Sequence, residues 1–480
     1  MSIEWAMSDK TPICVDLDGS LIHSDLLLES FLLLLKRNPL YVFLIPVWLL
    51  KGKAVLKAEI AKRVELNAAV LPYTQSFVVW LRERRTLGHP IWLCTASDQR
   101  LAQRVADHLG CFDGMLASDG VTNLSGRRKA QALVDRFGEK GFDYCGNHAV
   151  DLAVWAHARQ AVVVNASAAL AKQAAQVSVV AETFPFAGGG VKAWLKALRV
   201  HQWAKNALIF VPVAAAHKLT DVTVVWQALL AFVAFSLCAS SVYLLNDLLD
   251  LESDRAHHSK CHRPFASGRL NLLHGLLLAP LLLLGAFALS WTGVSLPFVG
   301  VLVVYYVVTL AYSFGLKRVV MIDVLTLAGL YTVRIVAGAA ATDIPLSFWL
   351  LMFSIFIFLS LAIVKRYAEL YVMREKGKLS ASGRGYHVED LSLLQNLGSA
   401  SGYLSILVLA LYVNSPEISV MYRHPKVVWF LVPVMLYWVS RIWVETHRGN
   451  MHDDPLVYAL KDRVSLLTGA VAAVVLWLAM

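Results

Sequence analysis

The chain has 480 residues, of which 57% are hydrophobic and only 16% carry a charge. This composition is typical of a membrane protein and excludes a disordered chain. The formal net charge of +10 is compatible with nucleic-acid binding, but the Lys and Arg residues gather in loops beside apolar stretches, so we expect a membrane and no nucleic acid as partner.

The N-terminal part, residues 1–185, differs from the rest because its charge is mixed and strand-like and helix-like patterns alternate. This alternation predicts an α/β domain built on a parallel sheet. Asp9 and Lys10 precede only a short apolar strand, so the first residues do not resemble a secretory signal. The six cysteines form no CxxC pair, which is typical of a reducing compartment.

A first motif, ICVDLDGS at residues 13–20, is a short apolar strand followed by Asp16, Asp18 and a glycine. Carboxylates at the end of a strand suit phosphoryl transfer, because one can attack phosphorus and the other can protonate the leaving oxygen. Taken alone, the same residues could form a turn with two solvated acids.

Three later segments extend this pattern in order. An apolar strand ends at the hydroxyl of Thr95, Lys129 opens a helical segment, and a third strand leads into a polar loop with Asn147 and Asp151. Because the C-terminal ends of parallel strands lie at one edge of a sheet, we expect these side chains to meet there.

These four motifs resemble the haloacid dehalogenase-like phosphatase family over about residues 11–185. The resemblance implies a Rossmann-like α/β fold with a helical cap, Asp16 as nucleophile and Asp18 as general acid and base. It also implies that Thr95 and Lys129 bind the phosphoryl group. The implied Mg²⁺ ligands are Asp16, Asp18, Asn147 and Asp151.

The chain departs from the family at one position. The last motif of the family usually opens with Gly-Asp, whereas this chain has Asn147, which offers a neutral oxygen, and retains Asp151. Metal binding is then weaker or rests on Asp151. An inert or regulatory domain is the alternative to an active phosphatase.

The insert between the first two motifs, residues 26–80, lies where such enzymes carry a helical cap. Its segments 26–35 and 40–50 are unusually apolar and are separated by Lys36-Arg37-Asn38-Pro39. Each segment is too short to cross a membrane comfortably. The insert is therefore either a hairpin that dips into the inner leaflet or an apolar cap packed on the sheet, and the sequence does not distinguish the two.

Residues 186–198 form a predicted linker, and residues 199–480 form a predicted all-α membrane domain. Apolar stretches in this domain have about the 20 residues that cross a bilayer. We expect nine spans, at about 203–219, 225–246, 272–290, 294–313, 320–340, 346–364, 399–414, 427–445 and 464–480.

The loops between these stretches carry an uneven charge. With the N-terminal domain in the cytoplasm, the inner loops of the membrane domain hold 15 Lys and Arg residues, whereas its outer loops hold only Arg423 and Lys426. This positive-inside bias predicts a multi-pass protein of the inner membrane, with the α/β domain and both active sites on the cytoplasmic side.

The second predicted span ends in NDLLDLESD, residues 246–254. On a helix, Asp247, Asp250 and Asp254 lie at i, i+3 and i+7 and share one face. Three close carboxylates repel one another unless a cation lies among them, and together with Asn246 they suit Mg²⁺ that holds a diphosphate. The alternative is an acidic, solvated helix end.

Polar and cationic residues lie near the ends of the predicted spans. Arg334 lies inside the fifth span and should meet an anion, either a substrate or the carboxylate of Asp323. Each of the others could be an ordinary interfacial anchor, but together they would surround a phosphate-rich substrate. The candidate substrate-binding residues are Lys205, Asn206, Arg263, Tyr312, Lys317, Arg334, Lys365 and Arg366.

A charged segment precedes the last predicted span. It either closes over the site or caps a helix, and the sequence favours neither. Its residues are Asp453, Asp454, Lys461, Asp462 and Arg463.

Nine apolar stretches with NDxxDxxxD after the second resemble the UbiA superfamily of intramembrane prenyltransferases, over about residues 195–480. Members that use aromatic acceptors carry a second acidic motif after the sixth span, where this chain has Lys365 and Arg366. The segments HQWAKN (201–206), YSFGLK (312–317) and KRYAEL (365–370) are instead similar to the decaprenyl-phosphate phosphoribosyltransferase branch. That resemblance implies phosphoribosyl pyrophosphate as donor and a polyprenyl phosphate as acceptor.

The two resemblances predict a bifunctional, Mg²⁺-dependent enzyme of cell-envelope biosynthesis. It would transfer 5-phosphoribose to a polyprenyl phosphate and then remove the 5-phosphate to give polyprenyl-phosphoryl ribose. The alternatives are a prenyltransferase for an aromatic acceptor with a regulatory α/β domain, and a transporter. The sequence leaves open whether the protein is a homo-oligomer.

Overall fold

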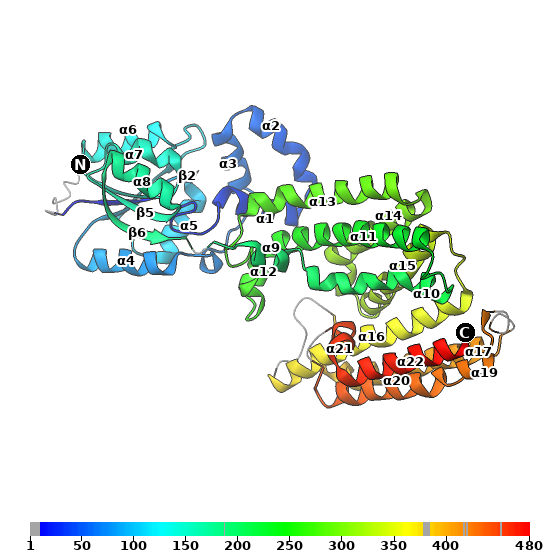
Figure 1. Cartoon of the computed structure of the whole chain (residues 1–480). Helices are drawn as coiled ribbons and strands as arrows, with labels where there is room; N and C mark the ends of the chain where they lie inside the picture. Colours follow the sequence, from blue (N-terminus) through cyan, green and yellow to red (C-terminus); the bar gives the residue numbers. More distant parts are fainter. Residues whose placement is uncertain (1–9, 187, 378–384, 416–417, 419–420, 452–453) are drawn as a thin grey trace. The chain divides into compact units, whose positions relative to one another are not determined.

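The computed structural model describes residues 10–186, 188–377, 385–415, 418, 421–451 and 454–480 (Figure 1). The chain divides into two compact units. The first comprises Met1–Leu198 and Tyr243–Ala279, and the second comprises Arg199–Val242 and Pro280–Met480. Two helices, α11 (Val222–Leu249) and α13 (Leu272–Gly293), contribute residues to both units.

The first unit contains a six-stranded sheet in which all neighbouring strands are parallel, in the order β3-β2-β1-β4-β5-β6. The predicted parallel α/β domain is therefore confirmed. In register, Val15 of β1 lies beside Leu93 of β2 and Cys145 of β4, so these three strands end at one edge. The strands are β1 (Ile13–Val15), β2 (Ile91–Asp98), β3 (Gly114–Ser118), β4 (Asp143–Gly146), β5 (Gln160–Ala166) and β6 (Val179–Pro185).

Helices cover both faces of this sheet. Successive side chains of each strand point to opposite faces, and the apolar ones on each face need a covering layer. Val15 enters a core with Phe77 of α4, whereas its neighbour Cys14 enters a second core with Trp155 of α7. Helices α4 and α5 lie on one face, and α6, α7 and α8 lie on the other (Figure 1). The bounds are α4 (Gln75–Thr86), α5 (Gln99–Leu109), α6 (Arg127–Phe137), η3 (Ala149–Asp151), α7 (Leu152–Trp155) and α8 (Ala168–Val177).

The insert between β1 and β2 is helical. Leu26, Leu32 and Leu34 of its first helix are buried in the core of the first unit, whereas most of the segment Pro39–Leu50 is exposed. The insert comprises α1 (Leu26–Arg37), η1 (Pro39–Leu44), α2 (Ile45–Leu50), α3 (Lys53–Ala61) and η2 (Ala68–Val70).

The second segment of the first unit, Tyr243–Ala279, begins in the last turns of α11 and packs on the α/β domain. Gly268 has φ +72°, and a Cβ atom there would lie 2.5 Å from the Cβ of His23, so only glycine allows this approach. The predicted linker contains a helix, α9. The elements are α9 (Val191–Ala197), α12 (Leu251–Arg255) and η5 (Lys260–His262).

The second unit is helical. Helix α15 packs against α14 and α16, α16 against α17, and α20 against both α17 and α22. Its elements are η4 (Val200–Phe210), α10 (Val211–Ala215), α14 (Leu296–Phe314), η6 (Leu316–Arg318), α15 (Ile322–Thr342), α16 (Phe348–Glu375), η7 (Val388–Asp390), α17 (Leu391–Val413), α19 (Pro425–Val428), α20 (Leu431–His447), α21 (Pro455–Lys461) and α22 (Arg463–Ala479).

Within the described residues, 7 helices are long and apolar enough to cross a membrane, and the pair α21 and α22, bent by 81°, gives up to 8. The protein is therefore a multi-pass membrane protein, but the predicted count of nine spans is not confirmed. The first predicted span, 203–219, is not among these helices. It is divided between the 3-10 helix η4 and the short helix α10, which has Pro212 in its first turn.

Candidate active sites

At the carboxyl edge of the sheet, a buried network joins three of the predicted phosphatase residues. Lys129 Nζ, from the first turn of α6, lies 2.7 Å from Asp16 Oδ1 and donates to the Tyr144 hydroxyl at 2.9 Å. The Tyr144 hydroxyl donates to Asp151 Oδ1 at 3.1 Å. The Asp151 Oδ2 atom accepts from the backbone N–H groups of Asn147 and His148. The network fixes Asp16 beside a permanent positive charge.

The second acid of the motif, Asp18, is held differently. Its Oδ1 accepts from the N–H of Leu26 at 2.7 Å, and its Oδ2 accepts from the Ser97 hydroxyl at 2.7 Å. The first turn of α1 therefore binds the Asp18 carboxylate.

Burial shifts the pKa of both acids upward. It raises the pKa of Asp16 to about 6, against the lowering effect of Lys129. Burial, with the carboxylates of Asp25 and Asp16, raises the pKa of Asp18 to about 7. A carboxyl group with a pKa near 7 can both donate and accept a proton at neutral pH, which is the role predicted for Asp18.

The remaining motif residues complete this edge. Thr95 is buried in β2, and its Oγ1 accepts from the N–H of Ser97 at 3.0 Å. Asn147 Oδ1 accepts from the Ser20 hydroxyl at 3.3 Å. Gly19 has φ +77°, and a Cβ atom there would lie 2.1 Å from Asn147 Nδ2. The structure thus brings the four predicted motifs together around Asp16.

Sequence reasoning missed three side chains at this edge. Ser97 and Tyr144 lie within strands, and Ser97 could have been suspected because it follows Thr95 by two residues. Lys57 comes from the cap helix α3 and donates to Asn123 Oδ1 at 2.9 Å and to a backbone carbonyl of β2 at 2.6 Å. Burial lowers the pKa of Lys57, against the raising effect of Asp18 and Asp25. No local pattern singles out Lys57.

The aspartate motif at the end of α11 forms a second acidic site in the first unit. Arg263 Nη1 lies 3.1 Å from Asp247 Oδ1 and 2.7 Å from Asp254 Oδ2, and both acidic side chains are almost fully buried. Burial raises the pKa of Asp254, and Arg263 opposes this. Two buried carboxylates thus share the guanidinium of Arg263, which offsets the cost of burying them.

Asp250 lies apart from this pair. It interrupts the helix, since α11 ends at Leu249 and α12 begins at Leu251, and its Oδ1 lies 3.0 Å from Lys36 Nζ of the cap. Over the ranges that the structure describes, no three His, Cys, Asp or Glu side chains are grouped to hold a metal. Mg²⁺ commonly uses one or two carboxylates with substrate phosphates and water, so Asp247 and Asp254 fit such an ion.

In the second unit, two of the predicted lysines converge on one carboxylate. Asp454 Oδ2 lies 2.7 Å from Lys205 Nζ and 3.1 Å from Lys365 Nζ, and it accepts from the Tyr331 hydroxyl at 3.2 Å. The Asp454 side chain also caps α21 by accepting from Leu456 N. The helix-capping alternative is therefore confirmed for Asp454, whereas closure over a substrate site stays a prediction. Its neighbour Asp453 lies outside the described residues.

Arg334 is buried beside these lysines and meets an amide rather than an acid. Its Nε donates to Asn206 Oδ1 at 2.9 Å, and Asn206 Nδ2 donates to Ser236 at 2.9 Å. A Cβ atom on Gly338 would lie 2.0 Å from the carbonyl oxygen of Ile209. This glycine lets η4 approach α15 closely enough for Asn206 to reach Arg334.

Arg366 forms the buried ion pair that the sequence suggests for Arg334. Arg366 Nη2 lies 3.0 Å from Asp323 Oδ1, and its Nε also contacts the same carboxylate. The Tyr312 hydroxyl donates to Asp323 Oδ1 at 2.8 Å. The suggested pairing of Arg334 with Asp323 is therefore wrong, because Arg366 satisfies that carboxylate. Lys317 lies in η6, next to the end of α14.

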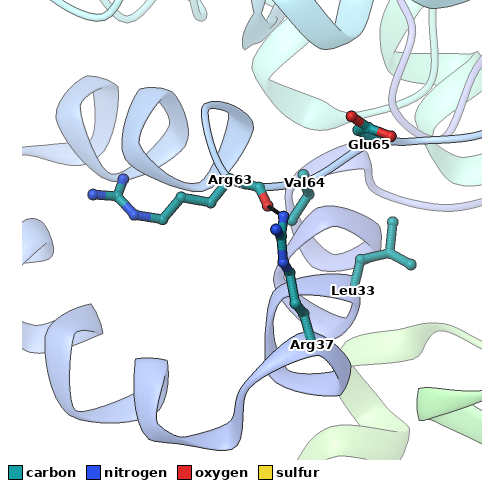
Figure 2. A pocket seen from close by; sticks show the side chains of 5 residues that line it. All are labelled: Leu33, Arg37, Arg63, Val64 and Glu65. Atoms are coloured by element: carbon teal, nitrogen blue, oxygen red, sulfur yellow. Dashed lines mark hydrogen bonds between the residues drawn. The ribbon is translucent and has the colours of Figure 1, made fainter.

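A separate pocket of about 300 Å³ lies between α1 and the segment after α3 (Figure 2). Arg37 and Leu33 of α1 and the residues 63–65 line it, and Arg37 Nη1 donates to the backbone carbonyl of Arg63 at 2.9 Å. None of the predicted catalytic residues lines this pocket.

The apolar helices, with acids and cations at their ends, define a multi-pass membrane protein. An α/β domain is fused to it. The family model described as "UbiA prenyltransferase family" matches residues 207–460. The chain belongs to this family.

Three comparisons place the chain among known proteins. An uncharacterised protein of Sinorhizobium fredii, y4nM, is 38% identical over 467 residues, covering 97% of this chain and 90% of the relative. The decaprenyl-phosphate phosphoribosyltransferase of Mycobacterium tuberculosis is 39% identical over 278 residues, covering 56% of this chain and 88% of the relative. A solved UbiA homologue from Archaeoglobus fulgidus, bound to GPP and Mg²⁺, has a TM-score of 0.45 and 14% identity, covering 59% of this chain and 99% of that chain.

Proposed function

We propose that the membrane domain transfers 5-phosphoribose from phosphoribosyl pyrophosphate to a polyprenyl phosphate, and that the α/β domain then removes the 5-phosphate. The observation that carries the first step is that two lysines of the second unit, Lys205 and Lys365, converge on the carboxylate of Asp454, to which the Tyr331 hydroxyl also donates. A donor that carries a diphosphate and a separate 5-phosphate needs cations for the 5-phosphate in addition to the metal site for the diphosphate. A prenyl diphosphate has no such additional phosphate and does not need these cations. The phosphoribosyltransferase named above supports this choice.

In the transfer step, negative charge builds on the diphosphate as its bond to ribose C1 breaks. Asp247 and Asp254, with Asn246, would hold Mg²⁺ together with the diphosphate oxygens, and the bound ion would neutralise that charge. Lys205, Lys365 and Arg334 are the proposed partners of the remaining phosphates. Because the acceptor phosphate is already an anion, the step needs no general base.

In the second step, the Asp16 carboxylate attacks the 5-phosphate and the bond from phosphorus to the ribose oxygen breaks. Asp18 gives its proton to that oxygen, and water then releases inorganic phosphate from Asp16. Lys129 holds Asp16 in place and balances the charge of the phosphoryl group. Asp16 and Asp151, with Asn147, would hold a Mg²⁺ ion there together with the substrate phosphate, and the bound ion would screen the phosphate from the carboxylates.

The proposal places both sites on the cytoplasmic side of the inner membrane. The positive-inside distribution of Lys and Arg supports this orientation.

The test is a reaction of purified protein with Mg²⁺, labelled phosphoribosyl pyrophosphate and a polyprenyl phosphate. We expect a lipid-linked ribose, and the Asp16→Asn variant should accumulate the 5-phosphorylated lipid instead. Absence of any labelled lipid would remove the transfer step from the proposal, and an unchanged product from Asp16→Asn would remove the phosphatase step.

The alternative, prenyl transfer to an aromatic acceptor, draws support from the family description. It predicts that prenyl diphosphate is consumed in the presence of an aromatic acid. The same preparation distinguishes the two, because only one donor should turn over.

A further inference from the structure

The segment Pro39–Leu50 of the cap, formed by η1 and α2, presents an apolar surface. The exposed fraction reaches 74% for Phe43 and 89% for Leu50. Apolar side chains grouped this closely on a surface mark a site for another apolar body. The other exposed apolar residues of the segment are Leu40, Val42, Leu44, Val47 and Leu49.

The chain around this segment is cationic. Between Glu29 and Glu59 there is no acidic residue, whereas Lys and Arg occupy positions 36, 37, 51 and 53 beside the segment. Arg63 lies over the Trp48 ring of α2, with its guanidinium carbon 4.9 Å from the ring centre, and it also pairs with Glu59 at 2.6 Å. Arg37 contacts the Arg63 backbone (Figure 2). An apolar helical segment with a basic rim is the pattern that binds an anionic lipid surface.

Two ion pairs place the segment next to the end of a membrane span. Lys36 Nζ lies 3.0 Å from Asp250, the residue that directly follows α11, and Glu29 pairs with Arg255 of α12. Helix α11 is long and apolar enough to cross a membrane. Pro39 follows Lys36 by only three residues, so the apolar segment begins close to the end of α11.

We propose that η1 and α2 form an interfacial membrane element that lies in the headgroup region of an anionic leaflet, with its apolar side chains inserted about 5–10 Å. Of the two alternatives for the insert, α1 matches the packed cap because Leu26 and Leu34 are buried in the core, and η1 with α2 would be the part that enters the leaflet. Helix α1 connects the element to Asp18, whose carboxylate binds the first N–H of that helix. If the α/β domain is the proposed phosphatase, its site is thereby held at the surface from which a lipid-linked phosphate is presented.

The experiment compares two positions of equal exposure in the full-length protein. Leu50 is 89% exposed and Val121, in the α/β domain, is 88% exposed. Each is replaced by cysteine in a Cys261→Ser background, labelled with a nitrobenzoxadiazole fluorophore and placed in nanodiscs of phosphatidylcholine and phosphatidylglycerol. Nitroxide-labelled lipid should quench the probe at Leu50→Cys several-fold more than that at Val121→Cys, and aqueous iodide should do the reverse.

Equal quenching at the two positions would overturn the proposal. So would a Leu50→Cys probe that is shielded from both quenchers, because that result indicates a protein surface, such as a second copy of the chain. In discs of phosphatidylcholine alone, or with Lys51→Glu and Lys53→Glu, quenching by lipid should fall, and unchanged quenching would remove the anionic-lipid part of the proposal. These readouts do not depend on either enzymatic activity, so their failure is distinguishable from a failure of the proposed function.

Discussion

Glu29 and Arg255 lie 226 positions apart in the sequence and form a bidentate ion pair whose two side chains are only 2% and 5% exposed. The two bonds measure 2.6 Å and 3.0 Å. Glu29 lies on α1, whose first N–H binds Asp18, and Arg255 ends α12, which carries Asp254. The pair therefore connects the two acidic motifs within one compact unit.

Breaking this pair should be costly. Arg255→Met leaves the Glu29 carboxylate buried without its partner, so we expect the free energy of unfolding of this unit to fall by about 3–5 kcal/mol. Thermal unfolding in detergent measures the change. Adding Glu29→Leu to the Arg255→Met variant should recover most of the lost free energy of unfolding. As a control, Lys62→Met removes the exposed pair with Glu59 and should change stability by about 0–1 kcal/mol. Equal losses for Arg255→Met and Lys62→Met would contradict the structural role of the buried pair.

Removing Arg263 should make the first unit depend more strongly on Mg²⁺. In Arg263→Ala, the buried carboxylates of Asp247 and Asp254 lose their shared cation and repel each other. We expect a lower melting temperature than wild type in EDTA and a larger increase on adding Mg²⁺. The exposed Arg269, in the same loop, serves as the control, and Arg269→Ala should respond to Mg²⁺ like wild type. If adding Mg²⁺ raised the melting temperature of Arg263→Ala and Arg269→Ala by the same amount, Asp247 and Asp254 would not bind the ion.

The turn of the first motif should not accept a side chain. Gly19 and Gly110 both have a positive φ, of +77° and +61°, but only at Gly19 would a Cβ atom collide, with Asn147. Gly110→Ala should lower stability by about 1 kcal/mol through backbone strain alone. Gly19→Ala should lower it further and abolish phosphatase activity, because Asn147 and Ser20 must move. Thermal unfolding and hydrolysis of a soluble phosphate monoester measure these effects, and equal stability of the two variants would show that the turn relaxes freely.

Much of the α/β domain could be predicted because short apolar runs mark the buried parallel strands. Asp16 and Lys129, 113 positions apart, meet because the parallel sheet orders β1, β2 and β4 side by side. Most of the membrane helices could be predicted as well, since an apolar run of about 20 residues has the length that crosses a bilayer. The structure of the segment 203–219 could not be predicted, because composition alone does not show that Pro212 starts a new helix after a 3-10 segment. The segment 464–480 has the length of a span only together with the bent helix α21.

Partner choice among the polar side chains could not be predicted. Arg334 and Arg366 both lie on apolar helices, and no sequence pattern favours the pairing of Asp323 with the second rather than the first. That choice depends on the rotation and close approach of helices, which Gly338 permits for η4 and α15. The separation of Asp250 from Asp247 and Asp254 could not be predicted either. Asp250 pairs with Lys36, which lies more than 200 positions away in the sequence.

Lys365 and Arg366 are adjacent but should respond oppositely to mutation. The Lys365 side chain is 32% exposed, and its Nζ contacts Asp454. Arg366 is 2% exposed and pairs with the fully buried Asp323. Lys365→Met should lower kcat/KM for phosphoribosyl transfer about 10²-fold while leaving thermal unfolding close to wild type.

Arg366→Met should instead lower the free energy of unfolding by about 3–5 kcal/mol, because it leaves a buried carboxylate without its partner. The transfer assay and thermal unfolding, applied to both variants, separate the two roles. If Lys365→Met were as unstable as Arg366→Met, Lys365 would be a structural residue and the transfer site would have to lie elsewhere. Arg366→Met with normal stability and a raised KM for the donor would instead assign Arg366 to the substrate phosphates, with Asp323 as its positioning residue.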